Sequence, residues 1–403
     1  MIKNLKFSAI TVISVFVLLS CSDIAYINHI YDMSSMLFVF RLIFIFILSI
    51  NLIAKKKINN LSKVFILINL LFVIFLGRSL MRTTDVGIYI LRTLSKPYLI
   101  VLFIQNYFED SNKIKKILSA WKKVLVLLCF IDFVTIIIFP NGMYKDKNYT
   151  LNWFLGYKTA RFVYSWPLLL ITSYLEFSEK EMTNKNLSIF TYFYFIICIF
   201  SAFKSEATGA STALLLYAVF IYYLKTKQRE KNLYKLYNIF NVKNVILSCT
   251  IVYCLIMTIE SNIYIQNFVS SVFNKSATLS NRVDIWRNCF VFFAESPVFG
   301  KGIYTPLEYK AITQYYLGTN AHNLLLTILV SGGIVAMVIY LAIFKVSMSR
   351  KRHVYTRQEV SLIASIIVFC IVGVISSALA FSPFAFCPFI LLELERKKKG
   401  KAK

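Results

Sequence analysis

Apolar runs recur along the whole chain, and short segments rich in Lys or Arg separate them. A helix needs roughly 20 apolar residues to cross a bilayer, and most of these runs approach that length. The pattern predicts an all-α, polytopic membrane protein whose residues 1–403 form one integral membrane domain with about twelve spans. The predicted spans are residues 7–22, 36–54, 62–77, 86–105, 122–139, 162–178, 188–204, 208–224, 244–260, 323–345, 359–377 and 379–394.

The last two predicted spans fit only as a tight pair, so a count of eleven spans stays open. Orientation follows from the basic residues, most of which fall in alternate connecting segments, such as 55–57, 113–123 and 225–243. Because cytoplasmic loops carry an excess of Lys and Arg, we expect both termini to be cytoplasmic. The predicted location is the bacterial cytoplasmic (inner) membrane, with outer segments at residues 23–35, 78–85, 140–161, 205–207 and 261–322.

Composition supports the membrane class and excludes one alternative. The sequence is 58% hydrophobic and only 16% charged, with a net charge of +26. So basic a chain could bind nucleic acid, but its Lys and Arg lie in short clusters between apolar runs rather than on a soluble face. We therefore expect anionic lipid and the bilayer as partners, and no nucleic acid. The eight cysteines show no metal-ligand spacing and are interpreted as small buried hydrophobes.

The outer segment 140–161 mixes basic and aromatic residues, including Lys158 and Arg161. Cations hold phosphate and rings stack on sugar faces, so the mixture suits an anionic, sugar-bearing ligand; an aromatic belt at the membrane surface is the alternative. Arg92 lies several residues inside a predicted span, where an arginine indicates a wet cavity, an anion or a side chain that reaches the interface. Asp132 lies mid-span, either as a partner for an arginine or as a packing group.

The longest outer segment, 261–322, has the richest chemistry. We predict a helix from Arg282 to about Glu295, on which Arg282 and Trp286 share a face while Arg287 points away. His322 and Asn323 stand where this segment enters the next span, and an imidazole there can accept a proton near neutral pH. Lys204 flanks a short outer turn, where a structural role is at least as plausible as ligand binding.

Together these motifs resemble the O-antigen polymerase/ligase family. The resemblance rests on RVDIW at 282–286, PVFGKG at 297–302, and HNLLL at 322–326 followed by Gly332-Gly333, and it covers residues 190–345, including the outer loop 261–322. The small-residue segment 205–215 also looks like a family motif, although Glu206-Ala207 stands where an Arg-containing variant is often seen. The resemblance implies a helical membrane glycosyltransferase acting on undecaprenyl-diphosphate-linked glycans, with its site open to the outer side.

The residues agree with such chemistry. Arginine grips phosphate through bidentate, permanently charged contacts, and a diphosphate is already a good leaving group. We therefore expect metal-independent, inverting polymerisation of lipid-linked repeat units into O-antigen or capsular polysaccharide, with no cofactor. A chain-length-determining protein is an expected partner. The expected catalytic residues are His322 and Arg282, and the expected substrate-binding residues are Arg161, Lys158, Arg92, Arg287, Lys204, Trp286 and Asn323.

Two alternatives stay open. An O-antigen ligase would transfer the glycan to a lipid A core instead of another lipid-linked repeat. A glycan flippase or transporter would also need a basic cavity. Such proteins more often show repeated halves and helices broken at corresponding positions, and the sequence shows neither feature.

Overall fold

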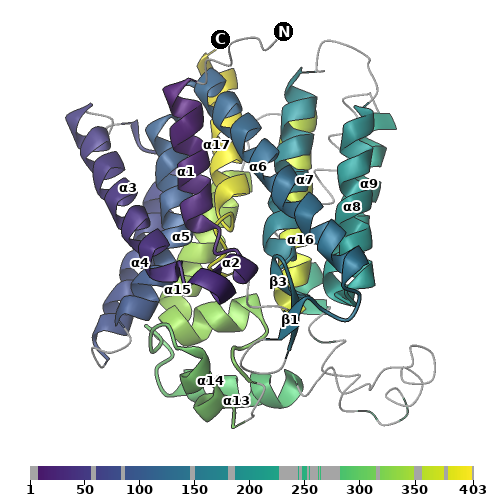
Figure 1. The fold of residues 1–403 in the computed structure, drawn as a ribbon. Helices are drawn as coiled ribbons and strands as arrows, with labels where there is room; N and C mark the ends of the chain where they lie inside the picture. Colours follow the sequence, from purple (N-terminus) through teal and green to yellow (C-terminus); the bar gives the residue numbers. More distant parts are fainter. Residues whose placement is uncertain are drawn as a thin grey trace.

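The computed structural model describes residues 8–55, 60–82, 87–145, 150–179, 187–226, 282–314, 318–348, 356–375 and 380–401, together with single residues and short pieces between 244 and 264. Helices dominate this part of the chain (Figure 1). Apolar runs form helices because a helix satisfies its own backbone hydrogen bonds where no water can. The helices are α1 (Ala9–Cys21), α2 (Ala25–Tyr31), α3 (Ser34–Ala54), α4 (Lys63–Leu80), α5 (Gly87–Asn106), α6 (Ser111–Ile138), α7 (Phe162–Glu179), α8 (Ile189–Lys204), α9 (Thr208–Thr226), α13 (Arg282–Ala294), α14 (Pro306–Thr313), α15 (Leu324–Met348), α16 (Arg357–Ile375) and α17 (Cys387–Lys401).

The protein is an all-α, multi-pass membrane protein. Five helices of the described chain, α3, α4, α5, α15 and α16, are long and apolar enough to cross a bilayer. The pair α1 and α2, bent by 73° at residues 22–24, adds a sixth candidate span, and α8 and most of α9 are shorter apolar helices. Large apolar side chains such as Phe46, Val73 and Ile196 are exposed on the outside of the bundle, where lipid would cover them.

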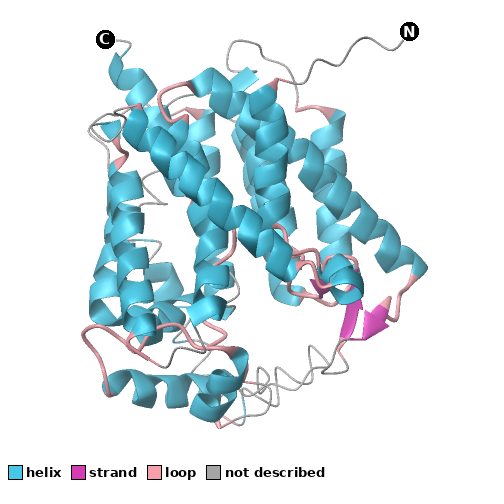
Figure 2. Ribbon diagram, turned by 60° about the vertical axis from the view of Figure 1, so that its left-hand side comes forward, coloured by secondary structure: helices cyan, strands magenta, loops and turns pink. Residues whose placement is uncertain are grey.

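The bundle has two chemically different ends. The chain enters α1 and leaves α17 at one end, which we call the termini face (Figure 1). The short helices α13 and α14 lie at the opposite end, the loop face, and so do the strands, which are magenta in Figure 2. These strands, β1 (Tyr144–Lys145), β2 (Leu151–Trp153) and β3 (Gly156–Tyr157), form an antiparallel sheet in the order β1-β2-β3.

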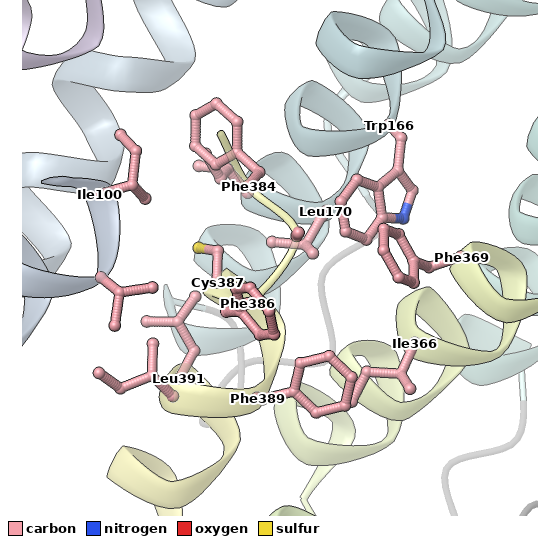
Figure 3. Close-up of a cluster of buried hydrophobic side chains, with 14 of the residues drawn as sticks. Ile100, Trp166, Leu170, Ile366, Phe369, Phe384, Phe386, Cys387, Phe389 and Leu391 are labelled. Carbon is pink, nitrogen blue, oxygen red and sulfur yellow. The ribbon is translucent and has the colours of Figure 1, made fainter. Parts of the chain in front are cut away.

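Aromatic and aliphatic side chains fill the centre of the bundle between α7, α16 and α17 (Figure 3). Trp166 of α7 lies 4.9 Å from Phe369 of α16, measured between ring centroids. Phe344 of α15 packs edge-on against Phe389 of α17 at 4.7 Å. These contacts join helices that are far apart in sequence into one core.

Most predicted spans coincide with helices, with three exceptions. The span 244–260 lies mostly outside the described residues. The predicted span 379–394 is wrong in its bounds: residues 380–386 form turns, and α17 extends from Cys387 to Lys401. The run Phe384–Phe386 packs into the core as irregular chain, so its apolar character reflects burial and not helix.

The third exception is the predicted span 323–345, which is not one continuous helix. At Gly333 the backbone of α15 has φ 66° and ψ −164°, outside the helical region. A break leaves carbonyls and N–H groups without intrahelical partners, which is costly inside a membrane unless other groups satisfy them. Those groups come from residues 297–302, the PVFGKG segment.

This segment fits into the break through its backbone. The N–H groups of Lys301 and Gly302 donate to the carbonyls of Val330 and Ser331, both at 2.9 Å. On the other side of the break, the N–H groups of Ile334 and Val335 donate to the carbonyls of Pro297 and Val298, at 2.8 and 3.1 Å. A Cβ on Gly300 would lie 2.5 Å from the Gly332 nitrogen, so glycine is needed for this close approach.

Candidate functional site

The loop face brings Arg282, Trp286 and His322 into one patch. Trp286 is fully buried, and its indole Nε1 donates a hydrogen bond to the carbonyl of Ala321 at 2.9 Å. Arg282 lies one helical turn before Trp286 at the start of α13, and His322 follows Ala321 directly. Arg282 and His322 are both half-buried and both take part in interactions. The expected helix from Arg282 is confirmed by α13, and we call this group the His322 patch.

The backbone at His322 is held in an unusual conformation. Its φ is +47°, in the left-handed region that few non-glycine residues adopt, although Asn, Asp and His do so more often than the others. The Asn320 side chain accepts a hydrogen bond from the His322 N–H at 2.8 Å. Asn323 then caps the first half of α15, because its Oδ1 accepts from the Leu326 N–H at 3.0 Å. Its Nδ2 donates to the Val374 carbonyl of α16 at 3.2 Å. The imidazole therefore projects from a fixed turn.

Arg287 does not join this patch. It is exposed, and its Nη1 lies 3.2 Å from Oδ1 of Asp284, which is exposed too. The expected divergence of Arg287 from Arg282 is confirmed, since α13 buries Trp286 and half-buries Arg282 on the opposite side. Lys204, at the last turn of α8, is also exposed. A cation there complements the helix dipole, which is the structural role that the sequence left open.

A second group, the Arg161 patch, lies where the sheet meets α6 and α7. Arg161 Nε donates to Asp132 Oδ2 at 2.6 Å, with only 4% and 2% of the two side chains exposed. Asp132 Oδ1 accepts from the Leu155 N–H at 2.9 Å. The Arg161 guanidinium lies 4.5 Å from the Trp153 ring. Asp132 is therefore an arginine partner, and that arginine is Arg161.

The rest of the Arg161 guanidinium is unusual. Both of its terminal nitrogens, Nη1 and Nη2, are buried and have no hydrogen-bond partner within the part of the chain that the structure describes. A buried cationic donor without a partner is expensive, so such a group indicates a missing acceptor, either water or an anion. Burial lowers the pKa of Arg161, while the Asp132 carboxylate opposes that shift. Lys158 is half-buried beside this patch, with its ammonium 5.7 Å from the Tyr157 ring.

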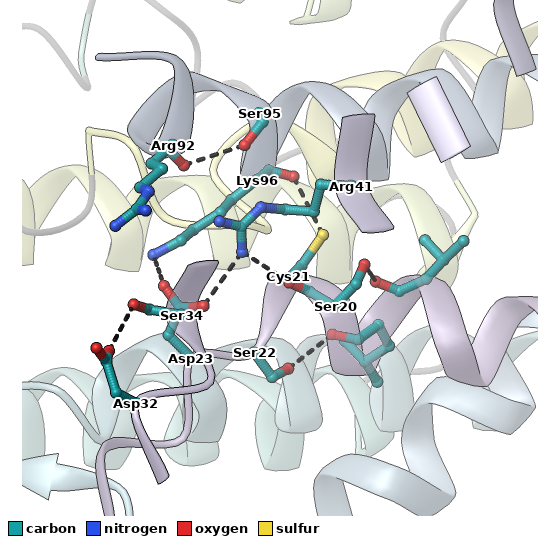
Figure 4. A network of polar contacts seen from close by, with 12 residues as sticks. Ser20, Cys21, Ser22, Asp23, Asp32, Ser34, Arg41, Arg92, Ser95 and Lys96 are labelled. Carbon is teal, nitrogen blue, oxygen red and sulfur yellow. Dashed lines mark hydrogen bonds and ion pairs between the residues drawn. The ribbon is translucent and has the colours of Figure 1, made fainter. Parts of the chain in front are cut away.

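Arg92 belongs to a third group, shown in Figure 4. Its Nη2 donates to the Ser35 hydroxyl at 2.8 Å, and its guanidinium carbon lies 5.6 Å from the Phe38 ring. Lys96, one turn further along α5, forms an ion pair with Asp23, which also pairs with Arg41 at 3.1 Å. We call Arg41, Arg92, Lys96 and Asp23 the α1–α2 cluster, because Asp23 lies at the bend between those helices.

The Arg161 patch and the α1–α2 cluster are neighbours. The hydroxyl of Tyr164, on α7, donates to the backbone carbonyl of Asp23 at 3.3 Å. The N–H of Tyr26, on α2, donates to the carbonyl of Phe154 at 3.2 Å. The short helix α2 thus lies between the two groups.

Arg78 and Arg82 hold residues 300–308 on α4. Arg78 Nε donates to the Gly300 carbonyl at 3.0 Å, and Arg82 Nη1 donates to the Ile303 carbonyl at 2.9 Å. Arg82 also pairs with Glu308, and its guanidinium lies 3.4 Å from the Tyr304 ring. The PVFGKG motif and these two arginines therefore position α13 and α14 over the bundle.

An apolar hollow lies apart from these polar groups. A cavity of about 320 Å³ opens between α8 and α9, lined by residues such as Phe195, Ile199 and Tyr222. Its lining is almost entirely hydrocarbon, so it suits lipid chains rather than phosphate or a reacting sugar.

Sequence reasoning did not find three of the polar residues. Asp23 and Lys96 carry no motif, and Asn320 looks like an ordinary loop residue; only their contacts across helices or turns show their roles. Arg41 had the same sequence signal as Arg92, a cation several residues inside a span.

Comparison with known proteins agrees with the residues of the loop face. The family model described as O-antigen ligase matches residues 191–341, a range that includes α8, α9, the His322 patch and the break in α15. Neither the curated proteins nor the solved structures contain a match to the chain. Members of this family are membrane glycosyltransferase-like enzymes that act on lipid-linked glycans. The matched segment, which is over a third of the chain, and the bundle of apolar helices support membership of the O-antigen ligase/polymerase family.

Proposed function

We propose that this protein polymerises undecaprenyl-diphosphate-linked oligosaccharide repeats into O-antigen or capsular polysaccharide. In this proposal the loop face is extracytoplasmic and the termini are cytoplasmic, in the inner membrane. The reaction is a metal-independent, inverting glycosyl transfer. A partner that sets chain length is expected, because a polymerase by itself has no means of counting repeats.

The chemistry assigns one task to each kind of side chain. An acceptor hydroxyl oxygen attacks the anomeric carbon of the donor sugar, and the bond from that carbon to the lipid diphosphate breaks with inversion. His322 accepts the hydroxyl proton as general base. The guanidinium groups of Arg282 and Arg161 stabilise the negative charge that develops on the leaving diphosphate.

The observation that carries this proposal is the link between Arg282 and His322 through Trp286. The indole of Trp286 fixes the turn before His322, and the same helix presents Arg282 one turn away. A base and a cation are thus held by one rigid contact, as a transfer site requires. The unpartnered Nη groups of Arg161 add a buried site for an anion on the same side of the bundle.

The remaining residues have supporting roles. Trp286 and Asn323 position His322, and Lys158 helps to hold the anionic donor beside Arg161. Arg287 and Lys204, both exposed, are assigned to the approach of the glycan at the rim rather than to the reacting phosphates. Arg92 is assigned to a phosphate of a substrate, in the separate α1–α2 cluster.

The test is the size of the lipid-linked products that accumulate in cells. A deletion strain carrying the His322→Ala variant should insert the protein normally yet contain only single repeats. Arg282→Lys should also fail strongly, because a planar guanidinium grips diphosphate at two points and an ammonium does not. Wild-type polymer in the His322→Ala strain would contradict the assigned base.

The family model is described as O-antigen ligase, so ligase activity is the second candidate. The same assay separates the two. Loss of a ligase leaves long polymer on the carrier lipid and none on the lipid A core, whereas loss of a polymerase leaves single repeats.

A further inference from the structure

The α1–α2 cluster holds more positive charge than its partners neutralise. Of its three cations, Arg41 and Lys96 pair with the carboxylate of Asp23, and Arg92 does not. The other carboxylate in Figure 4, that of Asp32, accepts a hydrogen bond from the Ser34 hydroxyl. Arg41 is 1% exposed, and Arg92 and Lys96 are one helical turn apart, so like charges lie close together on α5. Like charges at this spacing destabilise a helix unless an anion lies between them.

The hydrogen bonds of the cluster are also incomplete. Arg41 donates from Nη1 to the Ser20 carbonyl at 2.7 Å and to Asp23, but its Nε is buried without a partner. The Nε of Arg92 is likewise buried and unpartnered. The carboxylate of Asp23 pairs with Arg41 and Lys96. Arg92 instead donates to a neutral group, the hydroxyl of Ser35. These donors indicate an acceptor that the described residues do not supply.

The position of the cluster in the bundle narrows the kind of acceptor. Arg92 lies five residues and Lys96 nine residues into α5, which places them about 8 and 14 Å along the helix from its loop-face end. In a bilayer this is the region just below the headgroups, and cations there extend towards lipid phosphates. Figure 4 shows Arg92 and Lys96 extending to the same side of α5.

We propose that Arg92, Lys96 and Arg41 form a second anion site, which binds the phosphate group of a lipid separately from the His322 patch. Charge-assisted bonds from two guanidinium groups and an ammonium match phosphate oxygens. The binding proposal stands on the cluster alone. One candidate phosphate belongs to the lipid diphosphate that carries the acceptor glycan. This candidate rests on the proposed polymerase function, in which both substrates carry a lipid diphosphate. The other candidate is a bulk phospholipid headgroup.

The site can be tested by counting lipids bound to the full-length protein in a neutral detergent, by native mass spectrometry. The probes are undecaprenyl diphosphate without sugar and, separately, phosphatidylglycerol. The wild type should bind two molecules of undecaprenyl diphosphate. The double variant Arg92→Gln/Lys96→Gln should bind one, with affinity at the altered site lowered about tenfold or more. Asp23 keeps its partner Arg41 in this variant, so we expect the fold to be preserved, and thermal unfolding in detergent checks this.

Two further variants separate this proposal from the proposed function. Arg282→Gln, at the His322 patch, should weaken binding of the donor diphosphate, which Arg161 still contacts, and leave the second site unchanged. The triple variant should weaken both sites. The control variant Lys113→Gln, which alters an exposed lysine at the start of α6, should still bind two molecules of undecaprenyl diphosphate. Phosphatidylglycerol bound by the wild type and lost in the double variant would identify a phospholipid headgroup as the ligand. Unchanged binding of both lipids by a folded double variant would overturn the second site, whatever Arg282→Gln does.

Discussion

The indole nitrogen of Trp286 lies 2.9 Å from the carbonyl oxygen of Ala321, and this bond connects α13 to the residue before His322. Both residues are fully buried. The connection makes the position of the imidazole depend on a side chain one turn from Arg282. We therefore expect an apolar residue of similar size at position 286 to function less well, because it cannot donate to Ala321.

Replacing Trp286 with Phe should therefore lower polymer formation without unfolding the protein. Phenylalanine keeps most of the buried area but cannot donate to Ala321, and the lost hydrogen bond is worth about 1 kcal/mol. We expect kcat with a lipid-linked repeat to fall about tenfold while KM changes little, because the base is misplaced and the binding cations are not. An equal fall in kcat for Tyr309→Phe, a second buried aromatic on the same face, would show that the effect is not specific to Trp286.

The buried pair of Arg161 and Asp132 predicts a different separation of stability and activity. Asp132→Asn removes the charge that compensates Arg161 and should destabilise the protein by about 3–5 kcal/mol. The double variant Asp132→Leu/Arg161→Met replaces the pair with apolar groups and should recover most of that stability. Thermal unfolding in detergent measures both variants.

Activity tells whether Arg161 only packs or also binds phosphate. If Arg161 holds diphosphate, the stable double variant still makes no polymer. Polymer at the wild-type level in that variant would reduce Arg161 to a structural role and leave Arg282 as the phosphate ligand.

The positions of the helices could be predicted from sequence because each apolar run carries its own signal. The helix that begins at Arg282 was predictable from other local signals, because Asn281 is a suitable N-cap and Ser296-Pro297 ends the helical stretch. The contacts that build the site are not local. Arg161 and Asp132 are 29 residues apart in sequence, and nothing in either segment singles out the partner.

The break in α15 shows a second limit of the sequence signal. The sequence shows Gly332-Gly333 within the apolar run, but hydrophobicity alone does not distinguish a continuous helix from a broken one. The break depends on residues 297–302, which supply its hydrogen bonds from before the helix. The strands were missed because two or three residues are too few to show alternation.

Gly333→Ala should destabilise the loop face. The left-handed φ of 66° costs a non-glycine residue about 1 kcal/mol or more, and a Cβ would meet the carbonyl of Val298. We expect a lower midpoint of thermal unfolding and weaker protection of residues 297–302 from hydrogen exchange. Gly77→Ala is the matched control, because a Cβ there meets no atom within 4 Å; it should leave both measurements unchanged.

The orientation of the bundle can be tested by cysteine labelling in right-side-out membrane vesicles. Arg287→Cys places a thiol on the exposed side of α13, and a membrane-impermeant maleimide should label it without permeabilisation if the loop face is extracytoplasmic. The native Cys289 should not interfere, because burial raises the pKa of its thiol to about 12 and the unreactive protonated form persists from pH 7 to well above pH 9. The exposed Cys254 is replaced by Ser in every variant. Lys113→Cys, near the termini face, should react only after the vesicles are opened, since that end is then cytoplasmic. The reverse result, with Lys113→Cys labelled before permeabilisation, would place the His322 patch on the cytoplasmic side. Nucleotide-sugar donors are available on that side, so the proposed use of a lipid-linked donor on the outer side would be wrong.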